Sequence, residues 1–224
     1  MKSRPGRLFT YDDFADLSPT AVAPALSRLK ADGRIRRARK GVYYVPRATP
    51  LGEVPADSAA VGVKVAGRTA APSGLSAASA LGLTTQVPAH PELAVENRRP
   101  TPPPGISFRP RIGTNRSGLS PHEIAVFEVL RDLDGLADIS APRIEEKLVR
   151  VFKRRETRSR LLRAALAEPP RVRAMVGALA EAAGADPKEL RRLRRTLNPT
   201  TRFHFGPLAA LPEAPGWGAR GRAA

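Results

Sequence analysis

The densest group of cations in the sequence lies near the N-terminus. Five of the seven residues from 34 to 40 are basic, and Gly41 follows them directly. Closely spaced guanidinium and ammonium groups attract polyanions. Each contact with a nucleic-acid phosphate releases a counterion, which makes binding salt-dependent. The segment therefore predicts a phosphate-binding hairpin, with an ordinary charged surface turn as the alternative.

The residues before these cations predict a helix with two unlike faces. Val22, Leu26 and Leu29 are spaced four and three residues apart and form an apolar face. The opposite face holds small or polar side chains and one long cation: Thr20, Ala21, Pro24, Ser27, Arg28 and Ala31. Small side chains let a helix enter the major groove, where Thr, Ser and Arg bond base edges and phosphates. An ordinary solvated helix is the alternative.

These two elements supply the predicted DNA contacts. Thr20, Ser27 and Arg28 are expected to set the register in the major groove, with the hairpin cations on the flanking backbone or minor groove. The full predicted set is Thr20, Ser27, Arg28, Lys30, Arg34, Arg36, Arg37, Arg39 and Lys40.

A second group of residues has the order of a magnesium-dependent nuclease site. Asp138 precedes Glu145, Glu146 and Lys147, so two or three carboxylates could hold the ion beside a cation. However, a helix predicted from Pro142 onward places Glu145, Glu146 and Lys147 on its polar side. A solvated helix face is therefore the favoured interpretation, and the nuclease a less favoured one.

Other catalytic or metal-binding patterns are missing from the sequence. His90, His122 and His204 are scattered without zinc-site spacing, and there is no cysteine. The sequence has no Walker loop, no GxGxxG and no GxSxG. We therefore predict no catalytic residue, no metal, no cofactor and no enzymatic activity.

Charge and hydropathy narrow the class of protein further. The chain has 224 residues, with 38 Lys plus Arg against 21 Asp plus Glu and a net charge of +17. Residues 1–47 hold 11 basic and 4 acidic residues, the highest positive density, although coding bias toward arginine explains part of the excess. No apolar run spans a bilayer and no secretory signal is evident, so we expect a cytoplasmic protein without a membrane partner.

Capping residues and turns predict the elements of the first 47 residues. Thr10 and Asp13 form a capping-box pattern for a short helix near 11–16. Ser18 and Pro19 begin a second helix that ends at Gly33; Pro24, costing about 3 kcal/mol if interior, moves its expected start toward residue 21. Two strands are expected around the turn at residues 40–41.

The remaining sequence predicts mixed elements and then helices. Residues 46–55 and 100–105 are expected to be linkers or hairpin turns. Residues 57–66 predict a helix or a buried strand, 73–81 a capped helix, and 92–96 and 106–112 strands. Helices are predicted from Ser120, which opens a capping box, and at 142–152, 157–166, 170–183 and 187–197, followed by a possible strand at 202–205.

The predicted fold class is α+β and mainly α. The expected domains are a winged helix-turn-helix at 1–47, an α/β segment at 48–118, a helical domain at 119–211 and a disordered tail at 212–224.

The sequence also resembles a known family. The runs Phe9–Phe14, Ala25–Arg37 and Lys40–Pro46 resemble the N-terminal domain of AbiEi-type antitoxins of abortive-infection (type IV) toxin-antitoxin systems. The resemblance extends through Gly74–Gln86 and Pro170–Leu179. It implies a winged-helix repressor of its own operon, binding operator DNA, whose C-terminal domain assists DNA binding and counteracts a nucleotidyltransferase-like toxin.

One feature departs from the usual winged helix. A helix normally precedes the first strand, whereas eight residues precede Phe9 here. We expect the missing helix to lie upstream or to be supplied by the middle or last segment, because so short a domain buries little core.

Two further alternatives stay open at the level of sequence. The Arg191, Arg192, Arg194 and Arg195 run is either a solvated face beside a leucine stripe, a second DNA contact or a surface for an acidic partner. The whole chain could also be a protein-interaction module with a vestigial winged helix.

Overall fold

The computed structural model describes residues 4–67, 70–96 and 101–220, and its fold is α+β. The chain forms two compact units. Of the described residues, the first unit holds 4–67 and 101–107, and the second holds 70–96 and 108–220. The predicted middle domain at 48–118 is therefore not a separate unit: residues 48–67 and 101–107 belong to the first unit, and 70–96 and 108–118 to the second. No helix in the described ranges is long and apolar enough to cross a membrane.

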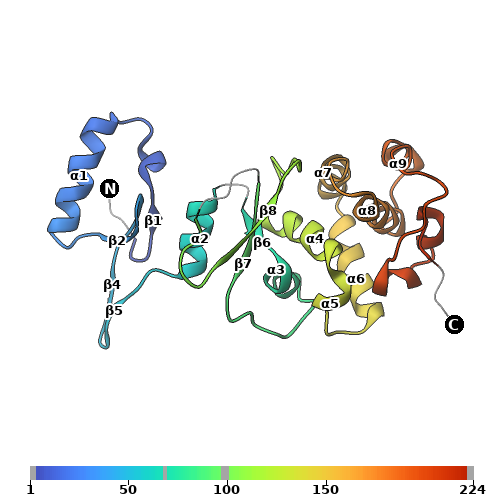
Figure 1. The fold of residues 1–224 in the computed structure, drawn as a ribbon, viewed down its shortest axis with the longest axis horizontal. Helices are drawn as coiled ribbons and strands as arrows, with labels where there is room; N and C mark the ends of the chain where they lie inside the picture. Colours follow the sequence, from blue (N-terminus) through green and yellow to red (C-terminus); the bar gives the residue numbers. More distant parts are fainter. Residues whose placement is uncertain (1–3, 68–69, 97–100, 221–224) are drawn as a thin grey trace. The chain divides into compact units, whose positions relative to one another are not determined.

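The first unit contains two small antiparallel sheets and two α-helices (Figure 1). In chain order its elements are β1 (Leu8–Phe9), the 3₁₀ helix η1 (Tyr11–Phe14), α1 (Pro19–Ala31), β2 (Arg36–Arg39), β3 (Val42–Tyr44), β4 (Arg47–Thr49), β5 (Gly52–Val54) and α2 (Ser58–Ala66). The first sheet has the strand order β1-β3-β2, and β4 pairs with β5. Residues 46–55, expected as a linker or a hairpin turn, thus contain a hairpin.

The predicted cap residues stand at the starts of both helices, but the Ser18 side chain makes no capping bond to the backbone. The backbone N–H of Thr10 donates to Asp13 Oδ2 at 2.7 Å, and η1 begins there. The carbonyl of Ser18 accepts from the N–H groups of residues 21 and 22, so α1 begins at Pro19 and not near residue 21. Pro24 lies inside α1, where it removes one backbone donor. Gly33, at φ 71°, follows the end of the helix as predicted.

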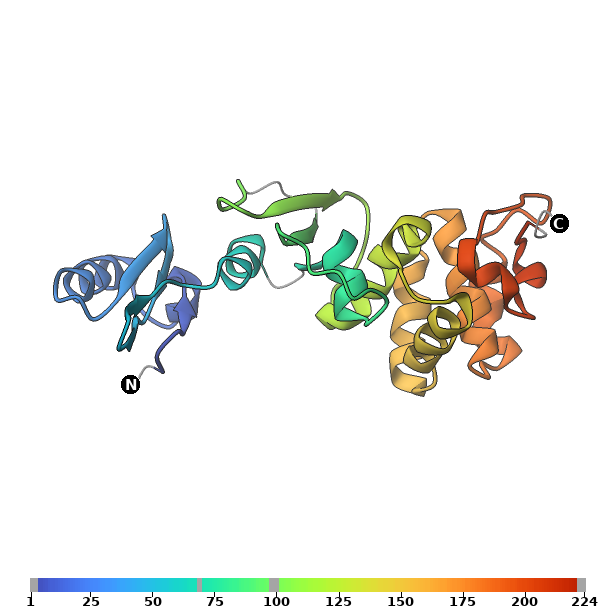
Figure 2. The same cartoon turned by 90° about the horizontal axis from the view of Figure 1, so that it is seen from below.

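The core of the first unit joins α1 to the three-stranded sheet, and the two lie side by side in Figure 2. Val22 and Leu26, the buried face of α1, pack with Phe9, Ile35 and Tyr43. On the strands, the rings of Phe9 and Tyr43 stack with centroids 6.0 Å apart. The apolar spacing predicted for α1 is therefore confirmed by its burial.

Helix α2 packs on the same sheet through β1 and β3. Its Val61 is buried, and Lys64 Nζ lies 2.8 Å from Asp13 Oδ2 at the end of η1. Helix α2, which follows the β2–β3 hairpin in the chain, thus covers part of the sheet. The predicted choice at 57–66 between helix and strand is settled as helix.

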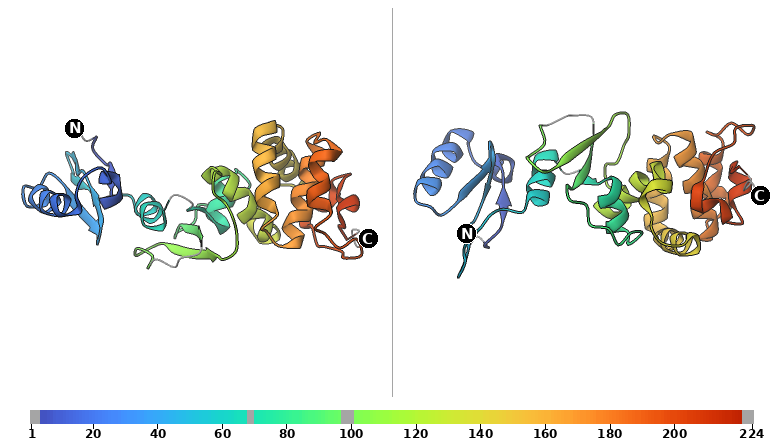
Figure 3. Two further views of the ribbon diagram at one scale, coloured as in Figure 1. Left: turned by 90° about the horizontal axis from the view of Figure 1, so that it is seen from above. Right: turned by 60° about the horizontal axis from the view of Figure 1, so that its bottom comes forward.

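The second unit combines a three-stranded sheet, ordered β6-β7-β8, with a bundle of helices (Figure 3). Its elements are β6 (Ala71–Pro72), α3 (Gly74–Ala80), β7 (Glu92–Glu96), β8 (Ser107–Arg111), α4 (Pro121–Arg131), α5 (Leu133–Leu136), α6 (Ala141–Phe152), α7 (Arg155–Ala165), α8 (Pro170–Ala182), α9 (Pro187–Arg194), η2 (Gly206–Ala210) and η3 (Ala214–Trp217). The capping box at Ser120 and Glu123 is confirmed. The possible strand at 202–205 is reduced to one isolated bridge between Phe203 and Ala219.

A buried ion network ties the sheet of the second unit to its helices. Glu128 on α4 is fully buried and accepts from Arg116 Nη1 at 2.7 Å, from Arg111 Nη2 at 2.6 Å and from the Ser73 hydroxyl at 2.5 Å. Arg116, 1% exposed, also donates to the buried Glu168, which follows α7. One carboxylate therefore joins α4 to β8 and to the start of α3.

The ionisation of Glu128 follows from these partners. Burial alone would raise the pKa of this carboxyl, but the hydrogen bond from Arg111 and the charge of Arg116 outweigh it. The pKa of Glu128 is therefore lowered from its ordinary 4.5, and the group stays charged.

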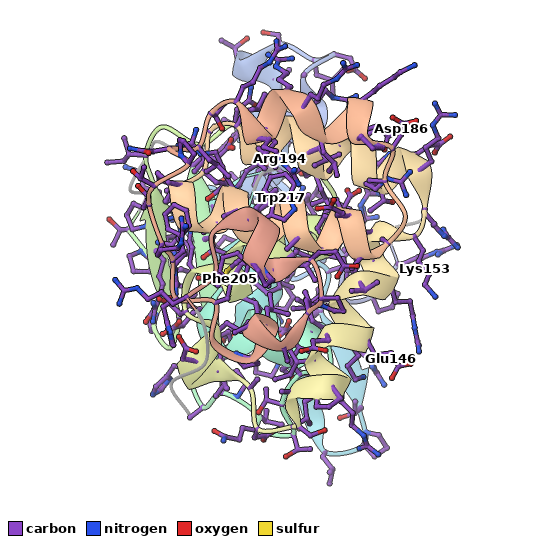
Figure 4. The ribbon with its side chains drawn as sticks, turned by 90° about the vertical axis from the view of Figure 1, so that its right-hand side faces the viewer. Glu146, Lys153, Asp186, Arg194, Phe205 and Trp217 are labelled. Carbon is purple, nitrogen blue, oxygen red and sulfur yellow. The ribbon has the colours of Figure 1, made fainter. Side chains whose placement is uncertain are left out.

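The predicted disordered tail is wrong for residues 212–220. Ala214 and Trp217 are buried, and the indole N–H of Trp217 donates to Glu181 Oε2 at 2.5 Å. Arg194, at the end of α9, lies 4.5 Å from the centre of the Trp217 ring (Figure 4). The indole is buried and its N–H has a hydrogen-bond acceptor, and this orders the segment. Its Pro- and Gly-rich composition alone predicts disorder. Residues 221–224 lie outside the described residues.

We expect Glu128→Gln to destabilise the second unit by about 3–5 kcal/mol, because Arg111 loses its paired carboxylate and Arg116 keeps only Glu168. Urea unfolding at pH 7 measures the loss. The lowered pKa means that this carboxylate's stabilisation is complete well above pH 4.5 and is lost as pH falls through the folded pKa. The variant should therefore also show a flatter loss of stability in acid.

The matched control is Glu146→Gln, which breaks an exposed i,i+4 pair with Arg150. Its expected cost is under about 0.5 kcal/mol. Equal costs for the two variants would contradict the role of burial.

Gly177→Ala should loosen the tail, because a Cβ at Gly177 would stand 2.2 Å from Cζ3 of Trp217. Overpacking of this kind costs about 1–3 kcal/mol. The chain contains one tryptophan, so a red shift of its fluorescence reports the displacement directly. Gly216→Ala, whose Cβ would meet nothing within 4 Å, should leave the spectrum unchanged.

Candidate nucleic-acid interface

The outer face of α1 has the exposure that the sequence predicts. Thr20, Ser27, Arg28 and Lys30 are all exposed, as are the small residues between them. The Thr20 hydroxyl lies 2.6 Å from that of Ser18, whereas the side chains of Ser27, Arg28 and Lys30 have no hydrogen bond or ion pair with any described residue. Their polar groups are therefore available to a ligand.

Helical geometry gives this face a simple layout. At about 100° per residue, Thr20 and Ser27 lie within roughly 20° of each other, along a stripe that includes Pro24. Arg28 and Lys30 lie roughly 80° to either side of that stripe. A strip of small side chains is thus flanked by one cation on each side, a layout that suits a groove between two phosphate backbones.

The predicted basic hairpin is present. β2 and β3 pair antiparallel, with Arg36 opposite Tyr44 and Arg37 opposite Tyr43, and the register shifts before Arg39. Gly41, at φ 81°, makes the turn. Lys40 at the turn and Arg34 before β2 are exposed, and their side chains have no bond to a described residue.

The three arginines of β2 differ from these cations because each has a partner within the first unit. Arg36 donates to the Gly33 carbonyl at 3.0 Å and pairs with Glu53 Oε2 of β5 at 3.1 Å. Arg39 Nη1 donates to the Thr101 carbonyl at 2.6 Å, and Arg37 Nε donates to the carbonyl of Arg39 at 3.2 Å. Only Arg36 is neutralised by a carboxylate; the other two keep their full charge.

Two residues that were not predicted from the sequence change the charge beside the hairpin. Glu53 places a negative charge beside the hairpin, and Arg47, exposed at the start of β4, adds an unpartnered cation. Proximity of Glu53 to Arg36 depends on pairing between β4 and β5. The Thr49 and Gly52 turn residues gave the only local indication of that pairing.

The support beneath the interface comes from α2. Burial disfavours the charged form of Asp13, but hydrogen bonds from Lys64 and Thr10 outweigh it and lower the pKa below the ordinary 3.8. The carboxylate thus stays ionised and connects α2 to the segment that leads into α1.

Two carboxylates of the nuclease hypothesis are engaged in other contacts. Asp138 accepts from the hydroxyls of Thr84 and Thr85, and Glu146 pairs with Arg150. Within the described ranges, no group of three His, Cys, Asp or Glu side chains could hold a metal ion. His90 and His122 are exposed, and His204 Nε2 lies 3.3 Å from Asp134 Oδ2.

The arginine run on α9 divides into two kinds of residue. Arg194 pairs with Glu181 at 3.0 Å and covers the Trp217 ring, so it belongs to the fold. Arg191, Arg192 and Arg195 are exposed and unpartnered among the described residues. The leucine stripe beside them is confirmed by the burial of Leu190 and Leu193.

Comparison with known proteins gives limited further information. Residues 1–93 match the model of a family of unknown function, DUF6088. No curated protein matches the chain. Among solved structures, the RV2827C protein from Mycobacterium tuberculosis is 17% identical, with 87% of this chain and 78% of that one covered and a TM-score of 0.39.

Lys64→Met should return the pKa of Asp13 toward 3.8, because it removes the ammonium that favours the carboxylate. The Asp13 carboxyl resonance, followed by NMR between pH 2 and 6, measures the change. The contribution of the pair to stability is present above the ordinary pKa and declines as pH falls through the lowered one. An Asp13 titration identical in both proteins would show that α2 does not support η1 in this way.

Proposed function

We propose that the protein is a sequence-specific DNA-binding transcription regulator whose first unit is a winged helix-turn-helix. The observation that carries the proposal is the exposed α1 face, a small-residue stripe between Arg28 and Lys30, followed directly by a basic hairpin. The element order β1, η1, α1, β2, β3 and the strand order β1-β3-β2 support it. The excess of basic residues supports it further.

In this proposal α1 lies in the major groove. Thr20 and Ser27 approach base edges, because neighbouring side chains are short enough for the backbone to come close. Arg28 and Lys30 reach the phosphates or bases at the two sides. Thr20 can rotate its hydroxyl away from Ser18 toward a base, at the cost of one exposed hydrogen bond.

The hairpin supplies sequence-independent affinity. Lys40 and Arg34 have no internal partner to give up, so each can neutralise a phosphate without breaking a bond. Arg37 and Arg39 keep their charge while bonded to carbonyls. Arg36 must first leave Glu53, an exposed pair worth at most about 1 kcal/mol, so it contributes less than its neighbours.

The narrower part of the proposal is an AbiEi-like antitoxin that represses its own operon and counteracts a nucleotidyltransferase-like toxin. The resemblance of Phe9–Phe14, Ala25–Arg37 and Lys40–Pro46 to that family supports it. A toxin gene beside this one, with relief of its toxicity on co-expression, is the expected finding. A solitary gene would favour a regulator without a toxin.

A protein-interaction module is the competing proposal. The unpartnered Arg191, Arg192 and Arg195 on α9 favour it, since they form an exposed cationic surface suited to an acidic partner. The two proposals differ in whether the upstream DNA of the gene is bound.

We expect the full chain to retard a duplex of its upstream region more than a scrambled duplex, with affinity falling as salt rises. Lys40→Ala should weaken both duplexes alike and reduce the slope of log K against log salt by about 0.9, the value for one phosphate contact. Ser27→Ala or Arg28→Ala should reduce the preference for the cognate duplex, by about 1–3 kcal/mol for a lost base contact.

Arg36 provides an internal control on the same strand. Arg36→Ala should change the salt slope less than Arg37→Ala, because Glu53 already neutralises it. Glu53→Gln should strengthen binding by removing an anion near the phosphates. Absence of any shift at low salt, or a shift unaffected by every one of these variants, would exclude the proposed interface.

A further inference from the structure

A second candidate binding site lies in the second unit, far along the chain from the proposed DNA-binding face. A cavity of about 540 Å³ opens between the ends of α3, α4, α6 and α7. Its lining is Leu81, Ser120, His122, Glu123, Lys147, Leu148, Arg150, Val151, Arg154, Thr157 and Arg160. Its volume is within the range of small-molecule sites.

The cations around this cavity exceed its carboxylates. Glu123, the one acid in the lining, is already bonded to Arg160 at 2.6 Å. Lys147 and Arg154 are exposed and their side chains have no bond to a described residue, and the Arg150 side chain pairs with the exposed Glu146. The lining therefore carries more positive than negative charge, and Lys147 and Arg154 in it have no paired carboxylate.

Backbone groups add to this field. No side chain caps the N-terminus of the 11-residue helix α7, whose N-cap residue Arg154 lines the cavity together with Thr157. Free N–H groups and the positive end of the helix dipole favour an anion at this place. The ammonium of Lys147 lies on the other side, 3.1 Å from where a Cβ on Gly82 would stand.

The remaining wall of the cavity is apolar and fixed. Leu148 is fully buried and Leu81 nearly so, and Val151 lies one helical turn from Lys147. Burial would raise the pKa of Glu123, but the hydrogen bond from Arg160 outweighs this effect and lowers the pKa. The carboxylate therefore stays charged and paired with Arg160. The site thus offers cations and N–H donors beside a rigid apolar surface.

We propose that this cavity binds a small organic phosphate of nucleotide size. Lys147, Arg154 and the first N–H groups of α7 hold the phosphate oxygens, and Leu81, Leu148 and Val151 contact the apolar or planar part. A hollow of about 540 Å³ with leucine and valine on one wall suits a small ligand better than the continuous backbone of a nucleic acid. The site lies entirely in the second unit, so it does not depend on the proposed DNA-binding function.

The test uses the full chain and isothermal titration calorimetry with ADP and with inorganic pyrophosphate, both without magnesium. We expect ADP to bind at one site per chain, and pyrophosphate about tenfold more weakly because it cannot contact the apolar wall. Lys147→Ala combined with Arg154→Ala should weaken ADP binding by tenfold or more. Neither residue has an internal bond, so the variant should fold normally.

The matched control is Arg143→Ala combined with Lys153→Ala, which removes the same charge from α6 and its C-cap outside the cavity; Lys153 extends away from the helix in Figure 4. Its ADP affinity should change less than twofold. Equal losses in both double variants would mean general electrostatic attraction and overturn the proposal. Failure of either probe to bind would also overturn it.

The experiments must also distinguish a small-ligand site from a groove that binds nucleic acid. If ADP does not bind but the cavity variant weakens binding of duplex DNA more than the control variant does, the surface serves nucleic acid, and the small-ligand proposal is wrong. If ADP binds while no DNA is retarded, the small-ligand site stands and the DNA-binding proposal falls.

Discussion

The Glu128 carboxylate is the constraint on which the second unit depends. A fully buried charge is tolerated only when hydrogen bonds and opposite charges replace water, and here Arg111, Arg116 and Ser73 do so. Because those partners come from three separate places in the chain, the sheet, the start of α3 and α4 must be correctly placed together. An apolar core alone would tolerate small displacements between these elements; a shared carboxylate with fixed donors does not.

Ion pairs of this kind also explain where the excess positive charge lies. In the second unit, Glu123, Glu128, Glu168, Glu181 and Glu189 each bond an arginine, so these acids are used to fix the fold. Cations left over at the surface, such as those of α9 and the α6–α7 cavity, therefore lack counter-charges. In the first unit two carboxylates are similarly used: Asp13 by Lys64 and Glu53 by Arg36. Part of the excess of +17 thus lies on surfaces where cations have no paired carboxylate.

Local patterns in the sequence predicted individual helices and the hairpin, but contacts between distant segments could not be predicted from them. Caps and apolar spacing located α1, the β2–β3 hairpin and α4, since each is decided by residues within a few positions. The partner of Arg36 on β5 and the packing of α2 on β1 depend on pairings that no single segment contains. Trp217 shows the opposite error: a Pro- and Gly-rich composition predicted disorder, but one buried indole with a satisfied N–H was enough to order the segment.

The path of the chain between the two units limits how the molecule can be divided. After α2 the chain enters the second unit, returns to the first for residues 101–107 and then leaves it again. Residue 101 supplies the carbonyl that holds Arg39, so a fragment ending after α2 would lose a support of its own hairpin. A single proteolytic cut or stop codon therefore cannot release the first unit intact. Because the chain passes between the units more than once, a single recombination break cannot exchange one whole unit for another. The two units are therefore expected to be inherited together.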